Sequence, residues 1–332
     1  MATILGIEST AHTFGVAVVR DGRILSNARR SYTTEKGGII PMEAAKHHRE
    51  NKEKIYSEAL EKAGIKYPEK ELDAIAISQG PGLAPCLLQG MGFAKELAEK
   101  LKKPVVPVNH CIAHLEIGRI TEAKDPVMLY ASGANTQIIA YASGKFRVFG
   151  ETLDIGIGNF IDTFARYAGI GFPGGPSIEK LALEKGRQLV KLPYKVKGMD
   201  IALSGILTNL KQKLESGKYN LKDLAFSLQE NVFAMLVEVS ERALAHTGKK
   251  ELLLGGGVAC NRRLQEMCKI MCEERGAKLF CPENQFLTDN AGMIAYLGEI
   301  MFKSGIKFEG KKILELDIKP RQRTDEVEVT WR

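Results

Sequence analysis

The sequence predicts an α/β protein with two lobes, and three observations lead to this expectation. Strand patterns alternate with amphipathic helical patterns, which implies parallel pairing and a sheet covered on both faces. The pattern that opens the chain begins a second time near residue 127. With 332 residues, the chain is long enough for two domains of ordinary size.

The composition narrows the class of protein. Hydrophobic residues make up 44% and charged residues 26%, as in soluble α/β enzymes and unlike disordered or fibrous chains. No run of 18 apolar residues and no basic leader is present, so we expect a cytoplasmic protein with no membrane span. The net charge of +7 suits a polyanionic partner, although many proteins that never meet nucleic acid carry a similar excess. The six cysteines form no CxxC pair and are expected to be reduced thiols.

The first lobe is expected over residues 1–125. It opens with a strand, a Ser/Thr-rich turn, a second strand, the Asp21-Gly22 hairpin signal and a third strand. A helix is expected over residues 43–63, where Gly64 supplies the stop. Further elements are then expected in this order: a strand at 72–78, a QGPG turn, a helix ending near 103, a strand at 105–108 and a helix opening at Asn109.

The second lobe is expected over residues 126–298, and part of 299–332 should complete the first lobe. Residues 127–149 repeat the opening three strands, and Ser132 and Thr136 fall where Ser9 and Thr13 fell. Such a duplication predicts two similar lobes facing one another across a cleft, each offering N–H and hydroxyl groups to nucleotide phosphates. A chance similarity between two hairpins is the alternative.

The rest of the second lobe combines helices with glycine-rich turns. A break at 172–176 precedes a helix containing Glu179, and a long helix is expected at 221–247. A buried strand at 251–254 runs into GGGVACN and a helix at 262–275, where a sugar or phosphate can approach the backbone. Such turns are common in α/β proteins, so this signal is weak by itself. A last helix is expected after Asn290, followed by a polar, irregular tail at 320–332.

His110 and His114 form the sharpest local signal. Their i, i+4 spacing places both imidazoles on one helix face, where they can bind one metal ion. The helix starts at the carboxyl edge of the expected sheet, where open α/β sheets bind ligands. A pair of core or capping histidines is the alternative. The segment reads HCIAH and lacks the glutamate of HExxH, which argues against peptide hydrolysis.

Together these motifs resemble the universal tRNA threonylcarbamoyl transferase family, in the archaeal and eukaryotic branch that supplies the catalytic subunit of the KEOPS complex. The resemblance spans nearly the whole chain, and the matching segments include GIESTAHTFGVAVV, SQGPGL, NHCIAHLE, LYASGANTQ, FGETLDIGIGN, FPGGPSIEKLA, KGMDIALSG, SLQENVFAML, LLLGGGVACNRRLQEM, TDNAGMIAY and PRQRTDEVEVTW.

The resemblance implies a fold and a set of site residues. The fold is the two-lobed actin-like ATPase (ASKHA) fold. The implied catalytic metal ligands are His110, His114, Tyr130 and Asp289. The implied nucleotide-binding residues are Tyr130, Ala131, Ser132, Gly133 and Ala134 in the turn near the phosphates, and Asp162, Gly175, Glu179 and Asn261 around the adenosine. The chain departs from the family at Ala134, where relatives usually carry a second glycine, and a Cβ there restricts backbone approach to phosphate.

The resemblance also implies an activity. The family transfers a threonylcarbamoyl group from threonylcarbamoyl-AMP, made by a partner enzyme, to the exocyclic amine of the adenosine adjacent to the anticodon in tRNA. One metal ion per subunit, iron or zinc, would polarise the carbamoyl carbonyl, and ATP is a further expected ligand. The implied partners are tRNA and the kinase, dimerising and regulatory subunits of KEOPS.

Two other functions remain open from the sequence. A small-molecule kinase of the same superfamily would need a carboxylate base beside the phosphates and would not need two helical histidines on a metal. A nucleotide-switched ATPase scaffold would organise partners, with hydrolysis incidental. Lysines at 95–103 and the arginines Arg321 and Arg323 are candidates for RNA contact, although solvated charge is the commoner role.

Overall fold

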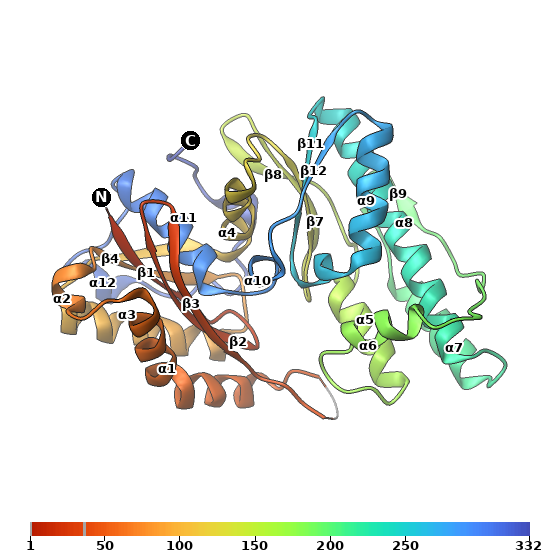
Figure 1. The fold of residues 1–332 in the computed structure, drawn as a ribbon, viewed down its shortest axis with the longest axis horizontal. Coiled ribbons are helices and arrows are strands. Elements are labelled where there is room, and N and C mark those ends of the chain that lie inside the picture. The colour runs from red at the N-terminus through yellow and green to blue at the C-terminus, as the bar shows by residue number, and fades with distance from the viewer. Residues whose placement is uncertain (1, 36–37) are drawn as a thin grey trace. The chain divides into compact units, whose positions relative to one another are not determined.

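The computed structural model describes residues 2–35 and 38–332 and divides into two compact units. The first unit comprises Met1–Tyr32, Ile39–Ile117 and Asp289–Arg332, and the second comprises Thr33–Gly38 and Gly118–Thr288. Each unit is built on its own five-stranded sheet (Figure 1). The chain therefore leaves the first unit before residue 118 and returns to it at residue 289.

The sheet of the first unit has the strand order β3-β2-β1-β4-β5. Its strands are β1 (Thr3–Glu8), β2 (Thr13–Arg20), β3 (Arg23–Ser31), β4 (Ala74–Gly80) and β5 (Val105–Asn109). The first three are antiparallel, whereas β1, β4 and β5 run parallel. The carboxyl ends of β1, β4 and β5 consequently meet at one edge of the sheet, the edge where α/β proteins place ligands.

Helices cover both faces of this sheet (Figure 1). Phe14 and Val16 of β2 share one apolar core with residues of α1 (Pro41–Ala63) and α3 (Ala84–Leu101). Ala17 and Val19 point the other way, toward α11 (Ala291–Lys303). The remaining elements are α2 (Pro68–Glu71), α4 (His110–Glu116), α12 (Lys312–Glu315) and η3 (Thr324–Glu326).

Gly6 lets α11 lie against β1 at backbone distance. A Cβ at this position would come within 2.5 Å of the Ala295 nitrogen and 2.6 Å of the Ala291 carbonyl oxygen. Neither backbone atom can move without displacing the helix, so only glycine fits. Because α11 packs this closely on the sheet, the segment just before it, which includes Asp289, is held in a fixed position.

The second unit repeats the topology of the first. Its sheet has the order β12-β11-β6-β7-β8, and it is formed by β6 (Val127–Ala131), β7 (Thr136–Ala142), β8 (Lys145–Glu151), β11 (Glu251–Gly255) and β12 (Lys278–Phe280). Read from β8, this is the first unit's order with the same antiparallel and parallel pairings. The duplication predicted from residues 127–149 is confirmed.

The large apolar core of the second unit lies between this sheet and its helices. The helices are η1 (Ile117–Thr121), α5 (Ile157–Tyr167), α6 (Gly175–Ala182), α7 (Ser204–Glu215), α8 (Leu221–Thr247), η2 (Gly257–Cys260), α9 (Arg262–Glu274) and α10 (Asn284–Leu287). A small hairpin, β9 (Val196–Lys197) and β10 (Asp200–Ile201), completes the unit. Among the described helices, none is long and apolar enough to cross a membrane.

The units divide at other positions than the lobe boundaries drawn from the sequence. Residues 118–125 belong to the second unit, where the nitrogens of Lys124 and Asp125 donate to the Glu251 carboxylate at 2.8 Å each. Residues 289–298 belong to the first unit, because α11 packs along β1, β2 and β4. The expected strand at 72–78 is also displaced, to Ala74–Gly80.

Candidate functional site

The two histidines of the HCIAH segment share the short helix α4. Asn109 ends β5 and caps this helix, since its Oδ1 accepts a hydrogen bond from the Ile112 nitrogen at 3.1 Å. The rings of His110 and His114 lie side by side, with centroids 4.8 Å apart and planes at 81°. Both side chains are buried. The i, i+4 arrangement predicted from the sequence is therefore present at the carboxyl edge of the first sheet.

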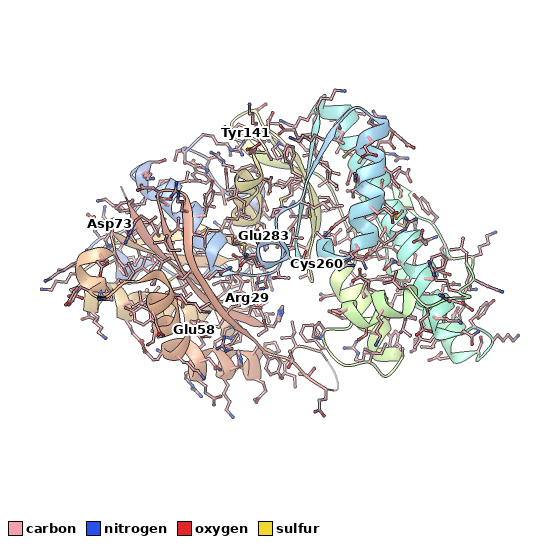
Figure 2. All side chains as sticks on the ribbon, in the orientation of Figure 1. Arg29, Glu58, Asp73, Tyr141, Cys260 and Glu283 are labelled. Carbon is pink, nitrogen blue, oxygen red and sulfur yellow. The ribbon has the colours of Figure 1, made fainter. Side chains whose placement is uncertain are left out.

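Asp289 reaches the same place from the segment before α11. Asn290 caps that helix by accepting from the Met293 nitrogen at 3.0 Å. Arg29, on β3 and labelled in Figure 2, donates to the Asp289 backbone carbonyl at 3.1 Å. These contacts hold the Asp289 carboxylate with its Oδ1 3.4 Å from His110 Nε2 and 3.6 Å from His114 Nε2.

The three side chains fit a metal ion. One ligand atom from each lies within 4.8 Å of the others, and this is the one such group of His, Cys, Asp and Glu found among the described residues. Donors bonded tetrahedrally at about 2.1 Å would lie about 3.4 Å apart, close to the two observed separations. Imidazole nitrogens with a carboxylate oxygen form a donor set that transition-metal ions accept. His110, His114 and Asp289 thus form a group able to bind a metal ion.

Burial and charge act in opposite directions on these groups. Burial lowers the pKa of His110, but the charge of Glu8 and hydrogen bonds with Asp289 and Glu8 raise that pKa well above its usual value. Burial dominates at His114, whose pKa is lowered. Burial raises the pKa of Asp289, and hydrogen bonds from the two histidines bring it well below its usual value. The carboxylate is thus held ionised, the form in which it binds a cation.

Glu8 is a member of this centre that the sequence analysis missed. It ends β1, is fully buried, and its Oε2 lies 3.0 Å from His110 Nδ1. Its other oxygen accepts from the Thr10 nitrogen at 2.7 Å and the Thr10 hydroxyl at 2.5 Å. An available signal was the position of this carboxylate, at the end of an apolar strand that opens a parallel sheet, on the same edge as the histidines.

Tyr130, the fourth ligand implied by the resemblance, belongs to the second unit. It lies on β6 and is buried. Leu129 and Ala131 point into the core with α5 and α8, so the alternation along the strand places Tyr130 on the opposite face of the sheet. Its role as a metal ligand stays a prediction.

The turn between β6 and β7, expected to contact phosphates, is tied to the start of α5. Ser132 closes the turn, because its hydroxyl and its backbone nitrogen both donate to the Asn135 carbonyl, at 3.1 and 2.9 Å. The Gly158 and Asn159 nitrogens donate to the carbonyls of Ser132 and Gly133 at 3.0 and 2.9 Å. Ala134 is exposed in this turn. The first amides of α5 therefore bind the turn itself.

Asp162 and Gly175 meet at the entry to α6. Asp162 Oδ1 accepts from the Gly174 nitrogen at 2.8 Å and so fixes the approach to Gly175, the first residue of that helix. A Cβ on Gly175 would meet nothing within 4 Å, so the space beside its backbone is open.

Glu179 and Asn261 link α6 to the start of α9. Glu179 Oε1 accepts from the Arg262 nitrogen at 3.0 Å. Asn261 caps α9 by accepting from the Arg263 nitrogen at 2.9 Å, and its amide donates to Gln229 at 2.8 Å. The structure thus brings α6 and the α9 N-terminus together and gives both side chains a structural part; their contact with adenosine stays a prediction.

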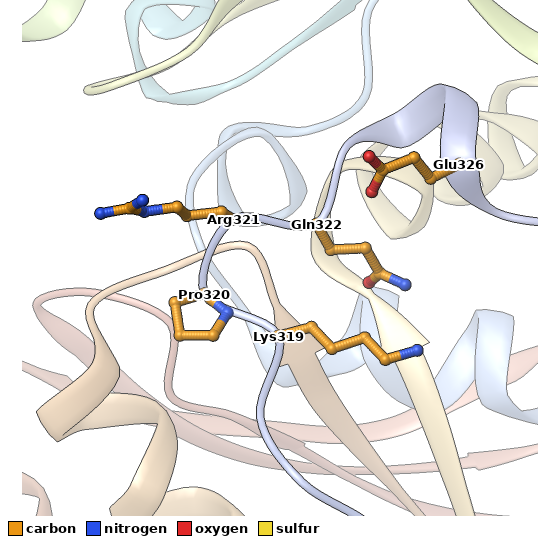
Figure 3. Close-up of a pocket in the computed structure, with 5 residues that line it drawn as sticks. All are labelled: Lys319, Pro320, Arg321, Gln322 and Glu326. Atoms are coloured by element: carbon orange, nitrogen blue, oxygen red, sulfur yellow. The ribbon is translucent and has the colours of Figure 1, made fainter.

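A cavity of about 560 Å³ in the first unit lies against the tail and not against the metal-binding group. Its lining residues are Lys319, Pro320, Arg321, Gln322 and Glu326. Lys319 and Arg321 point in opposite directions, and Glu326 adds a negative charge (Figure 3). Because the two cations do not converge, this cavity is a poor candidate for binding a phosphate.

Comparisons with known proteins agree with the geometry. The family model for TsaD, tRNA N6-adenosine threonylcarbamoyltransferase, matches residues 23–296. A relative of that name from Thermococcus kodakarensis is 56% identical over 327 residues, covering 98% of this chain and 99% of the relative. A probable bifunctional tRNA threonylcarbamoyladenosine biosynthesis protein from Methanocaldococcus jannaschii is 52% identical, covering 98% of this chain and 60% of the relative.

A solved structure supports the fold independently. HypF from T. kodakarensis aligns with a TM-score of 0.64 at 15% identity, covering 95% of this chain and 49% of HypF. The duplicated mixed sheets and this likeness identify the two-lobed actin-like ATPase fold expected from the sequence. The family match over most of the chain, together with the full-length relative, leads to one conclusion: the chain belongs to the tRNA N6-adenosine threonylcarbamoyltransferase family.

Proposed function

We propose that this chain transfers the threonylcarbamoyl group from threonylcarbamoyl-AMP to the exocyclic amine of the adenosine adjacent to the anticodon in tRNA. The observation that carries this proposal is the convergence of His110, His114 and Asp289 at the carboxyl edge of the first sheet, in a chain of this family. The reacting amine attacks the carbamoyl carbon, the bond from that carbon to the AMP oxygen breaks, AMP leaves, and the amine releases one proton.

The two histidines and Asp289 would hold one iron or zinc ion, with Tyr130 as a further ligand. A cation bound there supplies Lewis-acid polarisation of the carbamoyl carbonyl. The chain itself keeps the donors in place: Asn109 caps the histidine helix, and Arg29 holds the backbone of Asp289. A donor set that is already ordered loses little free energy in reorganisation when the reaction proceeds.

The second unit would bind the adenylate. We assign the phosphates to the turn of residues 130–134 and the adenosine to Asp162, Gly175, Glu179 and Asn261. The open space beside Gly175 and the short α6 to α9 connection through Glu179 support this assignment. ATP would occupy the same elements.

The proposed partners follow from the family. They are tRNA and the kinase, dimerising and regulatory subunits of a KEOPS-type complex, and the setting is the cytoplasm. The net charge of +7 is compatible with a polyanionic substrate.

Nucleoside analysis tests the proposal. The protein is incubated with threonylcarbamoyl-AMP, tRNA and the partner subunits, and the tRNA is digested and analysed for modified adenosine. We expect modified nucleoside with the metal-loaded protein and much less after chelation. Product formation at the level of a protein-free control would reject the transferase. If ATP were hydrolysed in that sample without nucleoside product, a nucleotide-switched scaffold would be favoured instead.

A further inference from the structure

We infer that Glu8 is a positioning residue that holds His110 as the tautomer with its proton on Nδ1, so that Nε2 is left as the metal-binding nitrogen. This inference rests on the metal site of the proposed function. It concerns a residue that does not itself contact the metal and instead acts through the histidine ring.

The hydrogen bonds of the Glu8 carboxylate show which atom donates in its contact with His110. Oε1 is taken by two donors, the Thr10 nitrogen at 2.7 Å and the Thr10 hydroxyl at 2.5 Å. Oε2 faces His110 Nδ1 at 3.0 Å. An ionised carboxylate can only accept, so Nδ1 must carry the proton in this contact. The opposite ring nitrogen, Nε2, faces Asp289 Oδ1 at 3.4 Å. With Nδ1 holding a proton for Glu8, Nε2 is the nitrogen that can give up its proton and bind a cation placed between the ring and Asp289.

The backbone around Glu8 makes this contact rigid. Glu8 ends β1, and the next residue, Ser9, donates from its nitrogen to the Ser78 hydroxyl of β4 at 3.1 Å. His110 follows directly on β5, which pairs with the other side of β4. The carboxylate and the ring are thus fixed by three adjacent parallel strands.

Glu8 is a carboxylate in an otherwise apolar buried strand, and its hydrogen-bond partners explain why it can be buried there. Every residue of β1 is buried, and the strand otherwise carries only apolar side chains, a threonine and a glycine. A charged carboxylate buried without partners strongly destabilises a fold, so a strand of this kind keeps one only where hydrogen bonds satisfy it. Metal-binding histidines commonly donate their second ring N–H to such a carboxylate, which fixes the tautomer and raises ligand basicity.

Glu8→Gln makes a sharp test because it changes the tautomer without changing the shape. The Thr10 nitrogen always donates, so the glutamine oxygen must take the Oε1 place and its NH₂ group must face His110 Nδ1. Nδ1 then has to accept, and the ring proton moves to Nε2, the atom that should bind metal. We expect the affinity for Zn²⁺ or Co²⁺ to fall by about 10- to 100-fold.

Glu299→Gln is the matched control. Glu299 is a buried carboxylate of the same unit, on α11, that accepts from the Gly22 nitrogen at 2.7 Å and pairs with Lys303. Its substitution is expected to lower the melting temperature without changing metal affinity. Metal affinity is measured by chelator competition, folding by thermal melts of the metal-free proteins, and the tautomer by ¹⁵N shifts of the histidine rings in the zinc-loaded proteins.

The outcomes separate the two proposals. Loss of affinity in Glu8→Gln but not in Glu299→Gln, with an Nδ1-protonated His110 in the wild type, supports the role of Glu8. If His114→Ala abolishes metal binding but folded Glu8→Gln binds as tightly as the wild type, the inference about Glu8 fails and the metal site stands. If His114→Ala retains the metal, the metal site fails, and the inference fails with it.

Discussion

Burial lowers the pKa of the buried histidines His110 and His48 alike, but the net shift of the pKa differs between them. At His110 burial is outweighed by the Glu8 and Asp289 carboxylates, and the pKa is raised. At His48, on α1, burial and then the neighbouring charge of His47 lower the pKa to about 4, although the Ala11 carbonyl accepts from its ring at 3.0 Å. His110 is thus a histidine hydrogen-bonded to two carboxylates, whereas His48 is a neutral side chain of the core.

The lowered pKa of His48 predicts loss of stability in acid. The unfolded chain takes up a proton at this residue near pH 6.5, whereas the folded chain does so only near pH 4. Stability is therefore complete above pH 6.5 and falls as the pH drops from 6.5 to 4. At pH 5, His48 lowers the unfolding free energy by about 2 kcal/mol relative to pH 7.5.

Urea unfolding of the wild type and of His48→Gln at several pH values checks this prediction. The fall in unfolding free energy between pH 7.5 and 5 should be smaller in the variant by about that 2 kcal/mol. Parallel pH profiles for the two proteins would contradict the assigned role of His48.

Single residues of the metal-binding group differed in how readily the sequence revealed them. The spacing of His110 and His114 is a local pattern, so periodicity alone predicted their shared face. Asp289 was placed beside them only through the family resemblance, because no local pattern relates it to α4. Glu8 was missed because its contact with His110 depends on strand order, which brings residues 102 apart in sequence to one sheet edge.

At the scale of elements, the contact between β1 and α11 controls where Asp289 lies. Gly6→Ala places a methyl group 2.5 Å from the Ala295 nitrogen, so the helix must shift. We expect a loss of about 1–3 kcal/mol in unfolding free energy and weaker metal binding, because Asp289 moves with the helix.

Gly92→Ala is the control for this substitution. Gly92 lies within α3, and a Cβ there would meet nothing within 4 Å, so the variant should gain about 0.5–1 kcal/mol with metal affinity unchanged. Denaturant unfolding and chelator competition on both variants provide the measurements. A Gly6→Ala protein with wild-type stability would show that α11 does not depend on this close approach.

Two substitutions of Asn261 separate its role as the cap of α9 from its proposed role in binding adenosine. Asn261→Ala removes the oxygen that accepts from the Arg263 nitrogen and should cost about 1 kcal/mol, whereas Asn261→Asp retains the cap. We propose that the adenosine contact of Asn261 is made by its side-chain amide, which both variants lack, so both should bind ADP more weakly. Calorimetric titration and thermal melts check this, and wild-type ADP affinity in both variants would contradict the assignment to adenosine.

At the scale of the whole molecule, the duplication was visible in the sequence but the limits of the units were not. Residues 127–149 repeat the opening strands closely enough to predict a second sheet, and the two sheets share one strand order. The boundaries differed because α11 follows the second unit in sequence yet is apolar on the face that packs on β1 and β2. Which sheet a helix joins depends on complementary surfaces such as Gly6, and periodicity does not reveal these.

Anomalous diffraction at the iron and zinc edges, from crystals of transfer-competent protein, tests the central claim most directly. The account predicts one strong peak at about 2.0–2.2 Å from His110 Nε2, His114 Nε2 and an oxygen of Asp289. An active protein whose crystals show no peak at this position, or a peak bound through other residues, would contradict it.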